Sequence, residues 1–581
     1  MVRRQKRIEM GYREDKADLL LKGVNLVNIF SGEIYPTNVA VGDGTIVGIG
    51  REYREGRVIY DLSGKYLLPG FINGHVHIES SLLIPSRYAE AVVPHGTTTV
   101  IADPHEIGNV WGIEGIRYLK NDSENLPLDL FFMAPSCVPA TTLETSGSAI
   151  GVKEIERLLK WDRVLGLAEV MNYPGVILRN DEVLAKLSVT EQQGKLIDGH
   201  APGVTGVSLN AYLDGGIESD HECITASEAK EKLRLGMWVM IREGSTAKNL
   251  ADLLPVADEV GHHRCLFVTD DLDPCDILEE GELDRILRKA VGLGFDPISA
   301  TRMATLNPAT YFGLRKRGAI APGYLADMVI VNNLREFSVE MVFKRGELVA
   351  ERGRFLKEVR PFPLSRAMPG MRIPSLSPRS FALPEHLGNI RVIGMIPDQI
   401  VTDSLELSGK IENGYLVSDP ESDILKLAVI ERHKGTGQIG LGFVKGFGLK
   451  KGAVASSVAH DSHNIIVAGV SDDDMICAVQ KVKEIGGGYV FSQEGKILSA
   501  LPLPIAGLMT DKPITQVVFE LRELNRLLHH AGVKPVHPFI ALSFLALPVI
   551  PKLKLTDKGL VDVCQFTLLP LMTGAHRSES S

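Results

Sequence analysis

The chain has few of the features that would assign it to several well-known classes. Its six cysteines are widely spaced and include no Cys-x-x-Cys pair, which excludes a zinc ribbon and gives no framework of disulfide bonds. No stretch reaches the about 18 uninterrupted apolar residues of a membrane span, and the basic start from Arg3 to Arg7 lacks the apolar segment of a signal peptide. A net charge of −9 provides no basic field for nucleic acid. We therefore expect a cytoplasmic protein whose partner is neither a membrane nor a nucleic acid.

The length and composition predict several domains. At 581 residues, with 44% hydrophobic and 23% charged residues, the chain is an ordinary globular protein that is too long for one hydrophobic core. Short alternating segments with turn residues in 1–66, and again in 318–358, predict one small β-sandwich-like domain built from both sides of an insertion. The Pro-, Arg- and Ser-rich segment 359–384 predicts a linker, and 385–581 predicts a C-terminal α+β domain.

The inserted segment, residues 67–317, alternates short apolar strands with stretches of helix length. This alternation is typical of parallel strands in an α/β fold. The expected strands are 67–77, 97–103, 130–134, 164–170, 195–200, 217–221, 238–242 and 265–270. Eight such units in about 250 residues predict a (β/α)8 barrel of the TIM type. A doubly wound open sheet is the alternative.

Histidines and carboxylates recur where these strands end. His75 and His77 are two residues apart, so an extended strand turns both imidazoles to the same side. The later strand ends add Glu169, His200, His221, Asp270 and Asp271. Each has a structural alternative, such as a hydrogen-bonded histidine, a helix N-cap or an ion pair with a neighbouring arginine. The carboxyl ends of barrel strands meet at the active-site face, so these histidines and carboxylates should lie together there. Such a group of ligands favours a site for two divalent metal ions.

Longer motifs identify a family. The segment Pro69 to Ile72 followed by His75 and His77, with His200, His221 and Asp270 downstream, resembles the amidohydrolase superfamily. Within it, the chain is similar to the adenine deaminases at residues 77–81, 102–109, 198–203, 219–222, 269–271, 459–464 and 501–509. The resemblance covers nearly the whole chain.

The resemblance implies a reaction and a set of site residues. It implies hydrolytic deamination of adenine to hypoxanthine and ammonia in purine salvage, by a hydroxide that bridges two ions, with Mn²⁺ expected and Fe²⁺ or Zn²⁺ as alternatives. The implied metal ligands are His75, His77, Glu169, His200, His221 and Asp270. Asp270 would also move the hydroxide proton to the leaving amine, and either Glu222 or Asp271 would contact purine N1. The implied further substrate contacts are Glu79, His105 and Glu106, the last two in a loop over the pocket, with a capped βα turn as the alternative. A homo-oligomer is also expected.

Two positions depart from the wider superfamily. Asn73 stands where amidohydrolases often carry Asp, which removes a charge near the metals. Glu169 stands where many binuclear relatives carry a carboxylated lysine, as expected for adenine deaminases. A hydrolase of cyclic amides, such as a dihydroorotase or hydantoinase, is an alternative that Glu169 disfavours. A non-catalytic scaffold is a second alternative, which the intact ligand set disfavours. The segment 459–464 is either a cover of the pocket or an ordinary polar turn.

Overall fold

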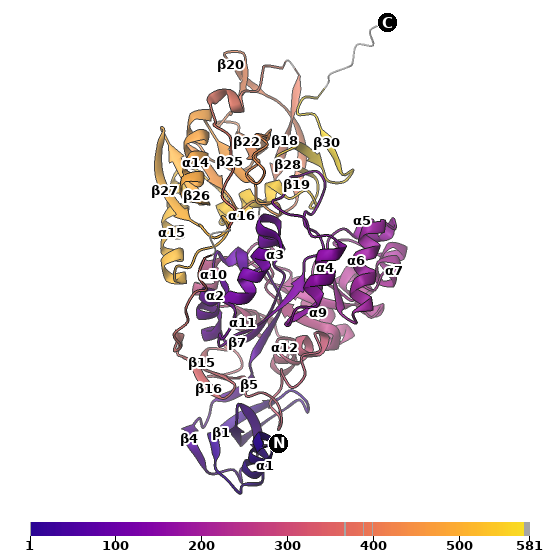
Figure 1. Ribbon diagram of the computed structural model, residues 1–581, viewed down its shortest axis with the longest axis vertical. Coiled ribbons are helices and arrows are strands. Elements are labelled where there is room, and N and C mark those ends of the chain that lie inside the picture. The colour runs from indigo at the N-terminus through magenta and orange to yellow at the C-terminus, as the bar shows by residue number, and fades with distance from the viewer. Residues whose placement is uncertain (1, 365–367, 387, 398, 574–581) are drawn as a thin grey trace.

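The computed structural model describes residues 2–364, 368–386, 388–397 and 399–573. The described residues leave out 365–367 of the predicted linker and 387, 398 and 574–581 of the predicted C-terminal domain. Three parts follow one another along the long axis of the molecule: a sheet that contains the N-terminal strands, a central α/β part, and a second sheet with its helices (Figure 1).

The central part is a ring of eight parallel strands. One sheet contains, in order, β6 (Phe71–Val76), β7 (Thr97–Ala102), β8 (Asp129–Ala134), β9 (Val164–Val170) and β10 (Leu196–Gly199). A second contains β11 (Ser219–Asp220), β12 (Trp238–Arg242) and β13 (Cys265–Val268). The Glu218 N–H donates to the Ile197 carbonyl at 3.0 Å, and the Asp270 N–H donates to the His75 carbonyl at 3.1 Å. The sheets therefore meet at both seams, which fits a TIM-type fold and not an open sheet.

Helices cover the outside of this ring (Figure 1). They include α3 (His105–Asp122), α4 (Val152–Leu159), α6 (Asp181–Gln192), α8 (Ala226–Arg234) and α11 (Leu283–Gly292). Strands β6, β7 and β13 are buried along their whole length, as expected when both faces of a parallel sheet are covered. In the part of the chain that the structure describes, no helix has both the length and the apolar character needed to cross a bilayer.

The first predicted strand, 67–77, divides into two strands at Gly70. Its first half, β5 (Tyr66–Pro69), pairs with β1 and β14 in the flanking sheet, and only β6 belongs to the ring. Gly70 donates its N–H to the Asp327 carbonyl at 2.9 Å. A Cβ at this position would lie 2.3 Å from Thr98 Oγ1, so the close approach of the two parts requires glycine.

The flanking sheet has nine strands from both sides of the ring. Its order is β17-β16-β15-β14-β5-β1-β2-β3, with β4 beside β1. The early strands are β1 (Ala17–Asn28), β2 (Glu33–Gly42), β3 (Thr45–Ile49) and β4 (Gly56–Asp61). The late ones are β14 (Met328–Val331), β15 (Val339–Lys344), β16 (Glu347–Glu351) and β17 (Arg354–Phe355). The sandwich arrangement and the exact domain boundaries stay predictions.

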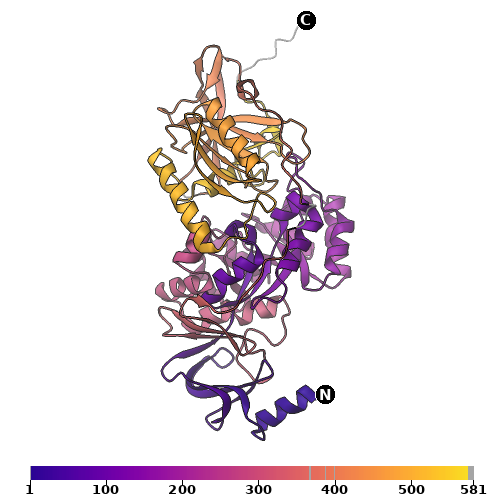
Figure 2. The same cartoon turned by 60° about the vertical axis from the view of Figure 1, so that its left-hand side comes forward.

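The C-terminal part contains an eight-stranded sheet of order β19-β18-β23-β22-β25-β24-β26-β27. Its strands are β18 (Asn389–Met395), β19 (Thr402–Ser408), β22 (Ile424–Ile430), β23 (Ile439–Lys445), β24 (Ala453–Ser456), β25 (Ile465–Gly469), β26 (Gly488–Gln493) and β27 (Lys496–Pro502). Helix α14 (Asp472–Glu484) packs on this sheet. Helix α15 (Ile514–His530) contacts α10 (Pro274–Glu279) and α2 (Pro85–Val92) of the central part, and Figure 2 shows it reaching down to them.

Candidate metal centre

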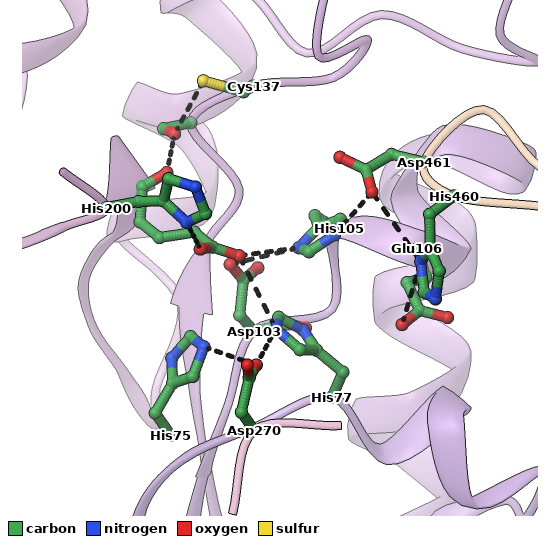
Figure 3. Close-up of polar contacts among 12 residues, drawn as sticks. His75, His77, Asp103, His105, Glu106, Cys137, His200, Asp270, His460 and Asp461 are labelled. Atoms are coloured by element: carbon green, nitrogen blue, oxygen red, sulfur yellow. Dashed lines mark hydrogen bonds and ion pairs between the residues drawn. The ribbon is translucent and has the colours of Figure 1, made fainter. Parts of the chain in front are cut away.

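Two histidines at the end of β6, His75 within the strand and His77 just after it, face one carboxylate. His77 Nε2 lies 3.1 Å and His75 Nε2 lies 3.5 Å from Asp270 Oδ1 (Figure 3). The Nδ1 atom of His77 is 3.1 Å from the Asp103 carbonyl, to which it donates, so its Nε2 keeps a free lone pair. His75 Nε2 is buried and has no hydrogen-bond partner among the described residues. Both atoms are therefore available to a metal ion.

Glu169, at the end of β9, lies between two groups of histidines. Its Oε1 is 3.6 Å from His77 Nε2, and its Oε2 is 2.8 Å from His200 Nδ1 and 3.1 Å from His221 Nε2. Although burial opposes it, His221 and His200 lower the pKa of Glu169 well below its usual range. An ionised carboxylate with one oxygen toward each group is placed to bridge two cations.

The six predicted ligands fit a binuclear metal site. Two of the separations between their nitrogen and oxygen atoms, 3.5 Å from His75 to Asp270 and 3.6 Å from His77 to Glu169, are longer than ordinary hydrogen bonds, and the others are 2.8–3.1 Å. They match pairs of ligands that each lie about 2.0–2.2 Å from a shared ion. The atoms of His75, His77 and Asp270 lie within 4.8 Å of one another, as do those of His75, Glu169 and His221. The set offers nitrogen and oxygen but no thiolate, which suits Mn²⁺, Fe²⁺ and Zn²⁺.

Arg242, the last residue of β12, lies beside this centre. It donates from Nη1 to Asp270 Oδ2 at 2.9 Å and from Nη2 to Glu222 Oε2 at 3.1 Å. Against the effect of burial, Arg242 holds the pKa of Glu222 well below its usual range. The other oxygen of Glu222 is 3.4 Å from His221 Nε2. Sequence reasoning missed Arg242, although the strand-end rule that found the ligands also applies to it.

The expected loop at residues 105–109 is wrong, because these residues form the first turn of α3, which begins at His105. Glu79 accounts for this start: its Oε1 accepts the N–H of Ile107 at 3.1 Å, which satisfies a free amide and complements the helix dipole. Glu79 is buried beneath this turn and is not among the described residues that line the pocket. His105 does line it, with Nδ1 3.5 Å from Glu169 Oε1.

Glu106 and Asp271 meet at one hydroxyl group. Ser80 Oγ lies 3.0 Å from Glu106 Oε1 and also hydrogen-bonds Asp271 Oδ1. Because a hydroxyl has a single proton, one of these two contacts requires a protonated carboxyl group. Burial, reinforced by the carboxylates of Glu79 and Asp271, raises the pKa of Glu106 well above its usual range. Glu106 is therefore the neutral partner.

The C-terminal segment 459–464 covers the pocket. Its Asp461 Oδ1 lies 3.6 Å from His105 Nε2, and its His460 Nδ1 lies 3.9 Å from Glu106 Oε1 (Figure 3). His463 Nδ1 accepts the Ala459 N–H at 3.2 Å, so the proton of its neutral ring is on Nε2, which points at Glu106 Oε2 from 3.7 Å. The neutral ring of His463 therefore has no free lone pair for a metal ion, and its Nε2 has no hydrogen-bond partner among the described residues.

The pocket over the metal centre has walls from both parts of the chain. The central part contributes the polar groups already described, together with Met171, Gly244, Thr246 and Ala247. The C-terminal part contributes His460, Asp461 and four apolar side chains, which are Ile400, Phe544, Leu547 and Ile550. The pocket is therefore lined by the predicted metal ligands of the central part and by apolar side chains of the C-terminal part.

Comparisons with known proteins agree with this architecture. A model of the amidohydrolase family matches residues 66–349, and a model of the adenine deaminase C-terminal domain matches residues 399–567. The protein named "Adenine deaminase 2" from Carboxydothermus hydrogenoformans is 50% identical over 565 residues, which cover 97% of this chain and 98% of that one. The chain belongs to the adenine deaminase family. The family expected from the sequence motifs is therefore confirmed.

Other adenine deaminases are similarly close. Those of Dehalococcoides mccartyi and Desulfatibacillum aliphaticivorans are 49% and 50% identical, and the alignments cover 97% and 95% of this chain and 99% and 97% of theirs. Among solved structures, an amidohydrolase is 17% identical with a TM-score of 0.42, covering 59% of this chain and 100% of that one. The similarity to adenine deaminases spans both the metal centre and the C-terminal wall of the pocket.

Proposed function

We propose that the protein is a metal-dependent hydrolase that converts adenine and water to hypoxanthine and ammonia. The observation that carries this proposal is Glu169 between two groups of histidines, in a pocket that apolar side chains also line. A purine is flat, neutral and largely apolar, with polar atoms at its edges, so such a pocket suits it. Membership of the adenine deaminase family supports the same substrate and a role in purine salvage.

We assign two divalent ions to the centre. One would be held by His75, His77 and Asp270, the other by His200 and His221, with Glu169 shared between them. When bound, such ions lower the pKa of water from about 15.7 to about 7 and so supply hydroxide at neutral pH. Mn²⁺ is the proposed metal, with Fe²⁺ and Zn²⁺ as alternatives.

The protein's own groups would then handle the protons. Asp270, ionised and held by Arg242, accepts a proton on the carboxylate and passes it to the departing amine at N6. Glu106, which is neutral because of its buried acidic surroundings, donates a proton to N1 of the purine. Glu222 is kept ionised by Arg242, so it accepts hydrogen bonds and does not supply this proton. Ser80 links Glu106 to Asp271 and orients both carboxyl groups.

The test is ammonia release from adenine by the Mn²⁺-loaded protein. A hydrolase of cyclic amides would release none from adenine, and a scaffold would release none from any substrate. His75→Ala should abolish turnover and lower the bound metal while the fold is kept, as measured by metal analysis and circular dichroism. His263→Ala changes an exposed histidine and is the matched control. Full activity in His75→Ala would refute the metal assignment.

A further inference from the structure

The two histidines of the proposed second ion are direct neighbours of residues in one buried polar network. His200 is followed by Ala201, and His221 is preceded by Asp220, which is 0% exposed. The N–H of Ala201 donates to Asp220 Oδ1 at 2.7 Å. The backbone that carries one histidine is therefore hydrogen-bonded to the side chain next to the other.

A buried lysine completes this connection. Lys232, on α8, is 0% exposed, and its Nζ donates to the Ala201 carbonyl at 2.8 Å and to Asp220 Oδ2 at 3.0 Å. A third hydrogen bond, at 2.7 Å, goes to Oε1 of Glu228, one turn earlier in the helix. Although burial opposes it, Asp220 raises the pKa of Lys232 above its usual range, so the lysine stays charged. Because an ammonium group has three donors, all of them are used and its position is fixed.

Glu228 extends the network to the loops that follow both histidines. Its Oε1 also accepts the N–H of Gly203 at 2.9 Å, and its Oε2 accepts the N–H of Ile224 at 3.3 Å. Gly203 lies three residues after His200, and Ile224 lies three residues after His221. Both loops are therefore attached to the first turn of α8.

The ligands of the other ion are held by different groups. The N–H groups of His75 and Thr269 both donate to Asn73 Oδ1 at 3.4 Å, and Thr269 directly precedes Asp270. The hydrogen bonds of the Lys232 side chain that the structure describes go to none of these residues. The two halves of the metal centre thus have separate supports.

We propose that Lys232 is a positioning residue that sets the affinity of the second ion site, formed by His200 and His221, without affecting the first. The inference rests on the proposed pair of ions. Metal ligands are oriented by the groups behind them, and the loss of one such group typically lowers metal affinity about 10–100-fold. Without the ammonium group, the carbonyl of Ala201 loses its hydrogen bond and Asp220 is left as a buried charge without its partner, so both histidines lose their shared support.

The test measures Mn²⁺ binding to the full-length, metal-free protein by equilibrium dialysis followed by metal analysis. The wild type should bind two ions per chain. Lys232→Met should bind one ion with wild-type affinity and the other about 10–100-fold more weakly, and its kcat on adenine should return toward the wild-type value in excess Mn²⁺. In a His200→Ala protein, which lacks a ligand of the second site, adding Lys232→Met should not weaken the ion that remains.

The matched control is Lys344→Met, which removes another buried lysine with the same kinds of partner. Lys344 is 6% exposed and donates to the carbonyl of Thr98 at 2.8 Å and to the carboxylates of Asp129 at 2.6 Å and Asp327 at 2.9 Å. Thr98 and Asp129 lie at the amino ends of β7 and β8, on the opposite face of the ring from the metal centre. Lys344→Met should therefore lower the Tm as Lys232→Met does, but leave the affinity for both ions unchanged.

If Lys232→Met does not fold, Asp220→Asn decides the outcome, because it keeps the shape of the side chain but leaves one oxygen to accept from both Ala201 and Lys232. It should weaken the same ion. A Lys232→Met protein that binds both ions as tightly as the wild type, or more tightly because Asp220 is uncompensated, would overturn the inference, as would an equal loss of affinity in Lys344→Met. A wild type that binds fewer than two ions would instead overturn the proposed metal centre.

Discussion

Replacing Arg242 by methionine should destabilise the metal-free protein far more than the metal-loaded protein. Arg242 is 3% exposed and donates to two buried carboxylates, those of Asp270 and Glu222. Methionine fills much of the same volume but leaves both negative charges without their partner. Because Asp270 is a proposed metal ligand and Glu222 lies beside His221, bound cations would compensate for part of the lost charge.

The expected size follows from the cost of breaking a buried ion pair. Removing one partner of such a pair costs about 3–5 kcal/mol. In a domain of about 150–250 residues, 1 kcal/mol corresponds to a shift in Tm of about 2–4 °C. We therefore expect Arg242→Met to lower the Tm of the metal-free protein by about 6–20 °C. The decrease should be roughly halved when Mn²⁺ is bound, because the cations take over part of the arginine's charge.

Scanning calorimetry with and without Mn²⁺ measures both decreases, and metal analysis of each sample establishes its occupancy. Arg264→Met is the control, because Arg264 is an exposed arginine whose guanidinium lies over the ring of Trp238, the first residue of β12. Its Tm should change by no more than about 2 °C, as for ordinary surface substitutions. A metal-free Arg242→Met protein that melts within this range of the wild type would refute the reasoning, as would equal decreases in the presence and absence of metal.

Two further perturbations test the carboxyl groups. Glu106→Gln keeps the shape of the side chain but cannot donate the proton, so kcat should fall by about 10²–10⁴-fold with unchanged metal content. The control, Glu114→Gln on the exposed side of α3, should leave kcat unchanged. An unchanged kcat in Glu106→Gln would contradict the assignment. Burial raises the pKa of Glu144 from 4.5 to about 8, so the folded protein holds a proton that the unfolded chain releases, and stability should decline as pH rises through this window. In Glu144→Gln, the decline in Tm between pH 5 and pH 9 should be smaller, because the variant lacks this carboxyl group. A pH profile of Tm identical to that of the wild type would contradict this role of Glu144.

Much of the ring and its ligands could be predicted from the sequence. The strands of a parallel barrel are short, buried and largely apolar, so β9 and β12 stand out as mainly apolar segments that end in a charged residue or just after one. Side chains at their carboxyl ends share one face, so His77 and Glu169 could be expected to meet although they are far apart in the chain. The prediction was weaker where a local signal was ambiguous. At His105 the family motif indicated a loop, and the helix start depends on Glu79, which lies in another segment.

The C-terminal wall could not have been predicted in this way. Ile400, Phe544 and Lys554 belong to separate segments, and their contact depends on how the C-terminal sheet packs over the ring. No periodicity in any single segment carries that information. An apolar residue such as Leu547 has the same appearance in a sequence whether it faces a core or a pocket. The interpretation of segment 459–464 as a cover of the pocket came from its resemblance to the adenine deaminases, with an ordinary polar turn as the alternative.

Asn73 shows how a loss expected from the sequence is compensated in space. The asparagine removes a carboxylate from β6, yet its amide donates to Thr269 Oγ1 at 2.7 Å and to the buried carboxylate of Glu282. Glu282 is 0% exposed and also accepts hydrogen bonds from Thr97 and from the N–H of Leu283 at 2.8 Å. A carboxyl group is therefore kept near Thr269, the residue before Asp270, but it comes from the start of α11, and burial raises its pKa. Because α11 follows the last strand of a closed ring, it lies beside the first strand, and only that closure places Glu282 next to Asn73.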